Sequence, residues 1–164
     1  MAQIAELLER YRRAPELLAA VLTGVKPEEE AYQPEPGKWS IRQIAAHLAD
    51  GELVAGHRLR QVIAEDDPTL IAYNQDAWAA RLGYAERKLK NAIETFRRLR
   101  AENYELLKSQ PEAAYERAGN HTEAGRVTLA QLLEGCTRHA ETHTRQIQEI
   151  RDRWKALRQR AHPL

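Results

Sequence analysis

Two histidines four residues apart, His139 and His143, are the residues whose types and spacing most clearly indicate chemistry. This spacing places their imidazoles on neighbouring turns of a helix, where both rings can reach one metal ion. The other members of their row are mostly apolar, and a buried polar group without a partner costs on the order of 1–3 kcal/mol. A shared metal ion is the most economical partner for both rings. The row consists of Leu129, Leu132, Cys136, His139, His143, Ile147, Ile150, Trp154 and Leu157.

A catalytic metal site needs three protein ligands and an open position for water or substrate. His47 is the natural third ligand, because it falls at the edge of the apolar face of an earlier helix. The alternative is a set of core histidines bonded to side chains or water. The segment is not the His-Glu-x-x-His motif of zinc proteases, because Glu141 comes one place too late and points about 160° away from His143.

Four long segments with apolar residues at helical spacing must position these histidines. Ser40 and Gln43 match a capping box at the start of the second segment, and Thr128 is suited to cap the last one. Because no alternating strand pattern accompanies them, we expect an all-α four-helix bundle, with residues 1–164 as a single domain. The expected helices cover residues 2–23, 40–64, 84–109 and 127–157.

The segments between the expected helices read as long loops. Residues 24–39 contain three prolines, which exclude regular structure, and residues 69–83 suggest a loop with one short helical turn. His121 lies among glycine, asparagine and threonine, so we expect a solvated loop residue there. His57 falls nearly opposite the apolar row of its helix, and His162 in the tail is expected to be exposed.

Four further residues are candidates for the site. Glu52 falls near the centre of the apolar row of its helix, where it could act as a general base, orient a ligand histidine or pair with a buried arginine. Tyr73 and Asp76, after that helix, could line the mouth of a pocket. Cys136 lies one turn before His139 and could touch the pocket, although a lone inward cysteine usually packs as a small hydrophobic residue.

Composition limits the other classes of function. A net charge of +1 provides no strong field for nucleic acid or an anionic membrane, and no run of 18 apolar residues could span a bilayer. A single cysteine excludes an internal disulfide and a four-cysteine zinc site. The first residues are charged and amphipathic, unlike a signal sequence, so a cytoplasmic location is expected.

The chain resembles the DinB/YfiT-like superfamily of metalloenzymes, whose name is shared with an unrelated DNA polymerase. The motifs that carry the resemblance are Trp39-Ser40-Ile41 with His47-Leu48, then Thr128-Leu129, and finally His139-x3-His143-x2-Gln146-Ile147. The resemblance implies an up-down-down-up four-helix bundle, often a homodimer, with His47, His139 and His143 as metal ligands. Many members carry a further histidine where this chain has Gly135, which leaves the three-ligand set intact and implies more space near the ion.

The resemblance also implies a chemistry. Characterised relatives include S-transferases and isomerases that use low-molecular-weight thiols, and members proposed as metal-dependent hydrolases. The shared step would be a divalent ion that lowers the pKa of a bound water or thiol for attack on a small electrophilic substrate. Zinc is the default ion, and nickel, iron(II) or manganese are alternatives.

Two other classes of function remain open at this point. The first is a non-catalytic bundle that binds a small ligand or a partner and keeps the ion as a structural staple. A fourth protein ligand, such as Glu52, would favour that structural site, whereas an open position beside a pocket would favour catalysis. The second is DNA binding, against which the near-zero net charge argues.

Overall fold

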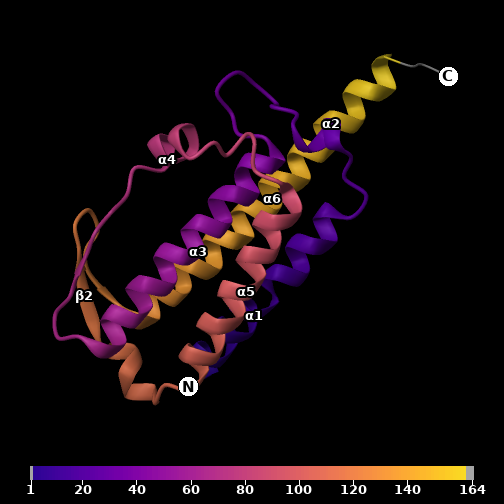
Figure 1. The fold of residues 1–164 in the computed structure, drawn as a ribbon. Coiled ribbons are helices and arrows are strands. Elements are labelled where there is room, and N and C mark those ends of the chain that lie inside the picture. The colour runs from indigo at the N-terminus through magenta and orange to yellow at the C-terminus, as the bar shows by residue number, and fades with distance from the viewer. Residues whose placement is uncertain (1, 162–164) are drawn as a thin grey trace.

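Four long helices follow the four amphipathic segments and pack side by side (Figure 1). The structure is a computed structural model that describes residues 2–161, so His162 lies outside the described residues. Helices α1 and α3 each contact both α5 and α6, and they face each other across the centre of the bundle. The four helices are α1 (Ala2–Leu22), α3 (Ile41–Ala64), α5 (Leu89–Lys108) and α6 (Leu129–Ala161).

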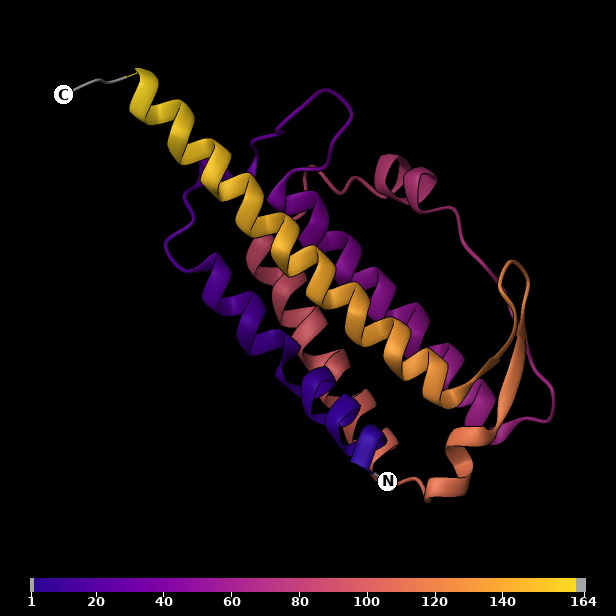
Figure 2. The same cartoon turned by 180° about the vertical axis from the view of Figure 1, so that it is seen from behind.

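The direction of the helices confirms the up-down-down-up topology. In Figure 1, α1 rises from the N-terminus at the bottom, α3 and α5 both descend, and α6 rises toward the C-terminus. Seen from behind in Figure 2, the last turns of α6 extend beyond the other helices. Leu157, expected to face inward, is therefore 46% exposed, because no helix lies opposite it at that end.

Both predicted caps are present. The Ser40 side chain accepts a hydrogen bond from the backbone N–H of Gln43, and the Gln43 side chain accepts one from the backbone N–H of Ser40. Thr128 and Gln131 make the same reciprocal pair at the start of α6, with distances of 3.1 and 2.8 Å. These bonds satisfy backbone donors that have no partner within a helix and so define where α3 and α6 begin.

A small sheet replaces part of the expected loops. It is built from β1 (Thr69–Leu70), β2 (Ala118–His121) and β3 (Gly125–Thr128), in the order β1-β2-β3. β1 pairs in parallel with β2, and β2 pairs antiparallel with β3. Gly119 explains the close approach, because a Cβ atom there would lie 3.0 Å from the Pro68 carbonyl oxygen and from the Leu70 side chain. The expectation of loops here was wrong. β2 and β3 form a hairpin that was not recognised, and β1 joins β2 from a distant part of the chain, a pairing that leaves no local pattern.

Helix α5 begins later than expected. Tyr84, placed at its start by sequence, is fully buried before the helix, and its hydroxyl donates a hydrogen bond to Asp50 at 2.9 Å. Arg87 forms an ion pair with the same carboxylate at 2.7 Å. These contacts with α3 hold residues 84–88 in a turn, so the helix forms only from Leu89. Three shorter helices lie in the connections: α2 (Pro27–Glu30), α4 (Gln75–Arg81) and the 3₁₀ helix η1 (Glu112–Glu116).

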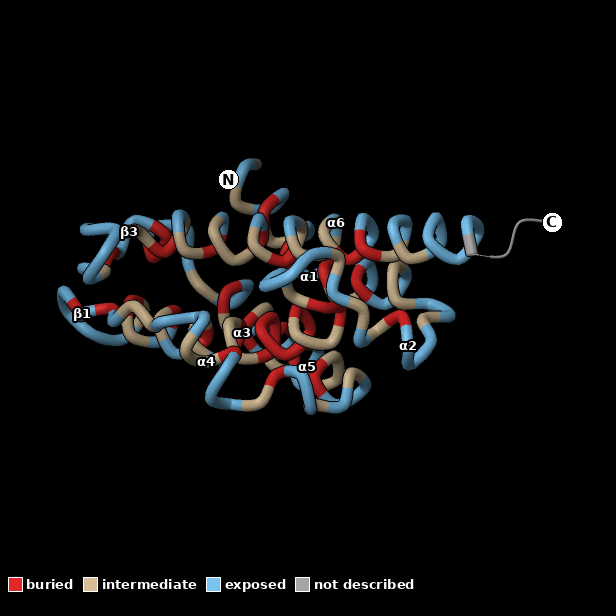
Figure 3. The backbone as a smooth tube through the Cα atoms, turned by 90° about the horizontal axis from the view of Figure 1, so that it is seen from above, coloured by how far each residue is buried: buried red, intermediate tan, exposed pale blue. Residues whose placement is uncertain are grey.

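The core runs along the inward faces of the four long helices, where the buried positions gather in Figure 3. On α5 the buried face differs from the apolar row expected from sequence, which was Leu89, Ile93, Phe96, Leu99 and Leu106. Phe96 is buried, but the other four are only half-buried. Arg100 and Asn103 are buried instead, because Glu52 of α3 provides a partner for both. None of the described helices combines the length and apolar composition that a membrane crossing requires.

Candidate metal centre

The imidazoles of His47, His139 and His143 meet between α3 and α6. Their ring centroids lie 4.6–4.9 Å apart, and each ring stands nearly at right angles to the other two. One nitrogen from each ring lies within 4.8 Å of the other two, and the Nε2 atoms of His47 and His139 are 2.8 Å apart. The three histidines singled out in the sequence are therefore brought together by the fold.

Two neighbours allow the rings to approach so closely. Gly51 lies one turn after His47 on α3, and a Cβ atom there would come within 3.3 Å of the His139 ring. Trp39 packs on the other side, with its ring centroid 4.8 Å from that of His47. The absence of a side chain at residue 51 and the indole of Trp39 together determine where the imidazoles lie.

Hydrogen bonding selects the tautomer of one ring. Nδ1 of His143 lies 2.8 Å from Oε1 of Gln146, one turn later on α6. An amide oxygen only accepts, so Nδ1 carries the proton and Nε2 keeps its lone pair. Such a second contact is what orients a metal-binding histidine. Nδ1 of His47 is buried and has no hydrogen-bond partner among the described residues.

All three imidazoles are held in the uncharged form that binds metals. Burial, and then the proximity of His143, lower the pKa of His47 to about 4. Burial and the two neighbouring rings lower the pKa of His139 to about 3, and burial lowers the pKa of His143. At neutral pH the three lone pairs are available for an ion without prior loss of protons.

The donor set fits a divalent transition metal. A tetrahedral zinc ion with bonds of about 2.0–2.1 Å separates its ligand nitrogens by roughly 3.4 Å. The separations between the histidine nitrogens, from 2.8 Å up to 4.8 Å, bracket that value. Among residues 2–161, no carboxylate or thiol completes a group of four with these rings. Three neutral imidazoles suit zinc, nickel or iron, and they leave the full charge on the ion.

Glu52 is buried in a polar network rather than free. Its Oε1 atom accepts hydrogen bonds from the Tyr11 hydroxyl and from the Asn103 amide, the latter at 2.8 Å. Its Oε2 atom forms an ion pair with Arg100 at 2.7 Å, and both side chains are only 2% exposed. The Arg100 guanidinium also lies 3.8 Å from the centroid of the Tyr11 ring. The carboxylate thus joins α3 to α1 and α5, and its lone pairs are largely occupied.

A cavity of about 290 Å³ opens beside His139, at the low end of the range for small-molecule sites. Tyr73 and Cys136, both proposed for a pocket, line it, and so does Glu52. Asp76 is exposed in the first turn of α4 and is not among the lining residues, whereas its neighbour Gln75 is. The other lining residues are Gly51, Ala55, Arg58, His121, Ala124, Val127, Gln131, Leu132, Gly135 and His139.

The protonation of the cavity wall follows from burial. Burial raises the pKa of the Cys136 thiol to about 12, so Cys136 is not a thiolate at neutral pH. Burial also raises the pKa of Tyr73, whose hydroxyl therefore remains a hydrogen-bond donor. Gly135 leaves space, because a Cβ atom there would meet nothing within 4 Å.

Arg58 and His121 are cavity residues that the sequence reasoning missed. Arg58 follows Gly51 by seven residues, a spacing that places both on one face of α3, and this spacing could have indicated it. No comparable signal existed for His121, which was expected in a solvated loop. The pairing of β2 with β1 and β3 brings it to the cavity.

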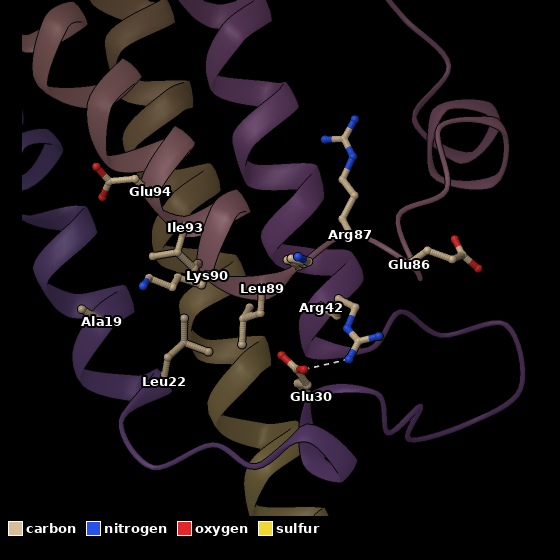
Figure 4. Close-up of a pocket in the computed structure, with 11 residues that line it drawn as sticks. Ala19, Leu22, Glu30, Arg42, Glu86, Arg87, Leu89, Lys90, Ile93 and Glu94 are labelled. Carbon is tan, nitrogen blue, oxygen red and sulfur yellow. Dashed lines mark hydrogen bonds and ion pairs between the residues drawn. The ribbon is translucent and has the colours of Figure 1, made fainter.

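A larger cavity, of about 650 Å³, lies away from the histidines (Figure 4). It is lined by the end of α1, the start of α3 and the start of α5, and its rim carries the 2.7 Å ion pair between Glu30 and Arg42. None of its lining residues is a histidine or a cysteine. The candidate functional site is therefore the smaller cavity beside His139, although the other cavity is larger.

The fold and the site together define a four-helix-bundle protein with a cluster of three histidines between two of its helices. The sequence matches the family model of the DinB superfamily over residues 10–147, and the chain belongs to that superfamily. This confirms the resemblance seen in the motifs.

Individual relatives agree with the family assignment. The chain is 25% identical over 151 residues to a protein of Geobacillus thermodenitrificans named as a proposed metal-dependent hydrolase, with 92% of this chain and 85% of that protein covered. A protein of Oceanobacillus iheyensis with the same description is 24% identical over 147 residues, covering 90% and 85%. The solved structure of YfiT from Bacillus subtilis superposes with a TM-score of 0.89 at 19% identity, over 94% of this chain and 89% of that one. YfiT is described as a probable metal-dependent hydrolase with an unusual four-helix bundle topology, and at this identity it supports the fold alone.

Proposed function

We propose that this protein is a metal-dependent enzyme in which His47, His139 and His143 hold a divalent ion beside the small cavity. The observation that carries the proposal is the convergence of three uncharged imidazoles, with ligand atoms within 4.8 Å of one another, one of which, His139, lines a cavity. The names of the relatives, proposed metal-dependent hydrolases, point in the same direction. Zinc is the first choice of ion, and nickel, iron(II) and manganese are the alternatives.

When bound, such an ion would lower the pKa of a water or thiol and so supply a nucleophile near neutral pH. The residues of this chain would orient the metal ligands and bind the substrate. Gln146 orients His143 through the bond to its Nδ1 atom. The Tyr73 hydroxyl, held protonated by burial, can donate a hydrogen bond to negative charge that develops on a substrate in the cavity.

The side chains of the cavity also limit where the nucleophile comes from. Cys136 stays protonated, and the Glu52 carboxylate is engaged by Arg100, Tyr11 and Asn103. Neither side chain is available as an unassisted nucleophile or base. The attacking group is therefore a water, giving hydrolysis, or an external low-molecular-weight thiol, giving S-transfer to a small electrophile.

The engagement of Glu52 also favours catalysis over a structural ion. A structural site is closed by four protein ligands, whereas a catalytic site keeps a position for water or substrate. Within residues 2–161 the group of ligands contains three histidines and no carboxylate. This arrangement supports an open position that faces the cavity.

Metal analysis tests the proposal first. Protein purified without a histidine tag is stripped with a chelator, reconstituted with zinc or nickel, dialysed and analysed for metal. We expect about one ion per chain for the wild type. The same is expected for the control variant His57→Ala, because His57 is an exposed histidine of α3, the helix that carries His47. The variant with His47, His139 and His143 all replaced by alanine should retain almost none. Equal, negligible metal in all three proteins would show that the proposal is wrong.

An activity screen separates catalysis from structural binding. The zinc and nickel forms are assayed for transfer of several low-molecular-weight thiols to monobromobimane and for hydrolysis of p-nitrophenyl acetate. We expect at least one reaction that the triple variant and the stripped protein lack. Stoichiometric metal without either reaction would favour the non-catalytic bundle with a structural ion.

A further inference from the structure

Arg58 is an unusual arginine in this structure. Among the described residues, five arginines are not exposed, and four of them form ion pairs with carboxylates at 2.7 Å: Arg42, Arg87, Arg100 and Arg151. The fifth, Arg58, forms no ion pair with any described residue. Its Nη2 atom donates to the Ile71 carbonyl oxygen at 2.6 Å, while its Nε atom is buried without a hydrogen-bond partner. A half-buried cation that lacks its counter-charge indicates that a ligand provides it.

Arg58 lies near enough to His139 for one ligand to contact both residues. Arg58 lines the same cavity as His139, Tyr73 and His121. It follows Gly51, the residue against which the His139 ring packs, by seven residues, which is about 10 Å along the axis of α3. One small molecule in this cavity can therefore reach Arg58 with one end while its other end lies at the histidines.

The other polar groups of the cavity also donate hydrogen bonds. The backbone N–H groups of Glu123 and Ala124 both donate to Nδ1 of His121 at 3.2 Å, so the proton of that neutral ring is on Nε2. The Tyr73 hydroxyl is protonated, because burial raises its pKa. The carboxylate in the lining, Glu52, is neutralised by Arg100. Hydrogen-bond donors around a cation that forms no ion pair with any described residue favour an anionic ligand.

The charge of Arg58 and the volume of the cavity restrict the class of ligand further. Glu123, in an exposed turn outside the lining, interacts electrostatically with Arg58 but forms no ion pair with it. One guanidinium therefore faces the cavity with one positive charge, which matches a monoanion better than a phosphate dianion. At about 290 Å³ the space accepts a small molecule and not a polymer segment.

We propose that the substrate or thiol co-substrate of this protein carries a carboxylate and that Arg58 binds it. The proposal rests on the proposed function for the identity of the reacting end, but the carboxylate site itself depends only on Arg58 and its neighbours. Arg58 is a specificity residue in this scheme. It positions the molecule through a charge-assisted hydrogen bond from its guanidinium group, which lines the cavity.

The test uses a matched pair of small thiols, 3-mercaptopropionate and its neutral amide, 3-mercaptopropionamide. Each is titrated into ¹⁵N-labelled protein, in both the zinc-loaded and the chelator-stripped forms, while the Nε–H signal of Arg58 is followed by NMR. That signal is assigned by its loss in Arg58→Gln. We expect the acid to shift it in both forms and the amide to leave it unmoved.

Affinities from the same titrations give the second readout. Zinc-loaded wild type should bind the acid at least about tenfold more tightly than the amide. The ratio should fall to about one in Arg58→Gln, recover in part in Arg58→Lys, and stay unchanged in Arg138→Gln, which replaces an exposed arginine of α6. Equal shifts by acid and amide in the wild type, or an unchanged ratio in Arg58→Gln, would overturn the proposal. Tighter binding of inorganic phosphate than of the acid would also overturn it, because the site would then suit a dianion.

The two proposals fail in different ways. If the protein holds no metal but the acid still shifts the Arg58 signal in the stripped form, the carboxylate site stands and the proposed function falls. If zinc binds and both thiols bind it equally, the metal centre stands and the carboxylate site falls.

Discussion

Glu52 shows how a single residue can serve the site without being a ligand. Its carboxylate, on α3, is bound by side chains from two other helices: Tyr11 on α1, and Arg100 and Asn103 on α5. Removing one partner of such a buried pair leaves an uncompensated charge, which costs about 3–5 kcal/mol. Glu52 therefore holds α3 in place near the histidines, and its negative charge is neutralised by Arg100 inside the bundle.

Two glycines of the cavity wall give a matched prediction at the residue scale. A Cβ atom at residue 51 would lie 3.3 Å from the His139 ring, whereas one at residue 135 would meet nothing within 4 Å. Because alanine favours a helix over glycine by about 0.5–1 kcal/mol, neither Gly51→Ala nor Gly135→Ala should unfold the protein. We expect Gly51→Ala to weaken zinc binding about 10–100-fold by displacing His139, and Gly135→Ala to leave it unchanged.

Competition with a chromophoric chelator measures both affinities. A Gly51→Ala protein that binds zinc as tightly as Gly135→Ala would show that the position of the His139 ring does not limit metal binding.

At the scale of the elements, the start of α3 determines whether His47 can reach the site. Ser40 begins the helix seven residues before His47, and it is buried, while its capping-box partner Gln43 is half-buried. Thr128 and Gln131 do the same for α6, which carries the other two histidines. The two caps, placed at the starts of antiparallel helices, thus set the register in which the three rings meet.

The cap of α3 gives a prediction about stability. Ser40→Ala removes the acceptor for the Gln43 N–H and should lower the free energy of unfolding by about 1 kcal/mol. Ser109→Ala, at the exposed end of α5, replaces a serine whose hydroxyl donates to the Leu106 carbonyl and accepts from the exposed Gln110 amide, but caps no helix N-terminus; it should change the free energy of unfolding by less than about 0.5 kcal/mol. Urea unfolding measures both, with a shift of the midpoint at constant slope. A Ser40→Ala change no larger than that of Ser109→Ala would contradict the importance of the box.

At the scale of the whole molecule, the buried histidines make stability depend on pH. The pKa values of His47 and His139 are about 4 and about 3 in the folded protein, against roughly 6.5 in an unfolded chain. Below pH 6.5 the unfolded chain therefore takes up protons that the folded protein does not. The stability that the two uncharged rings contribute is complete above pH 6.5. It is lost as the pH falls, down to about pH 4 for His47 and about pH 3 for His139.

We expect the metal-free wild type to lose stability on acidification from pH 6.5 to 5, by up to about 1.4 kcal/mol per pH unit for each histidine. The double variant His47→Gln/His139→Gln should lose much less over the same range. Urea unfolding at a series of pH values measures the slopes. The same slope in both proteins would mean that these two rings are not held uncharged by the fold.

Features of this protein that arise from short segments of the chain are predictable from its sequence. Helical spacing, the two caps and the three histidines are local patterns, and each was predicted by residue number. The homodimer and the thiol stay predictions. Asp76 was chosen from its position in a loop, and the fold leaves it exposed outside the cavity.

The sequence by itself determined the bundle and the donor set, because apolar periodicity, capping residues and imidazoles are properties of short segments. Only the tertiary structure decided the partners that lie far apart in the chain. It paired Glu52 with Arg100, anchored Tyr84 on Asp50, built the sheet that brings His121 to the cavity, and left Arg58 without an ion pair to any residue between 2 and 161. The physical reason is that burial and charge pairing are relations between distant residues, and they exist only once the helices have packed.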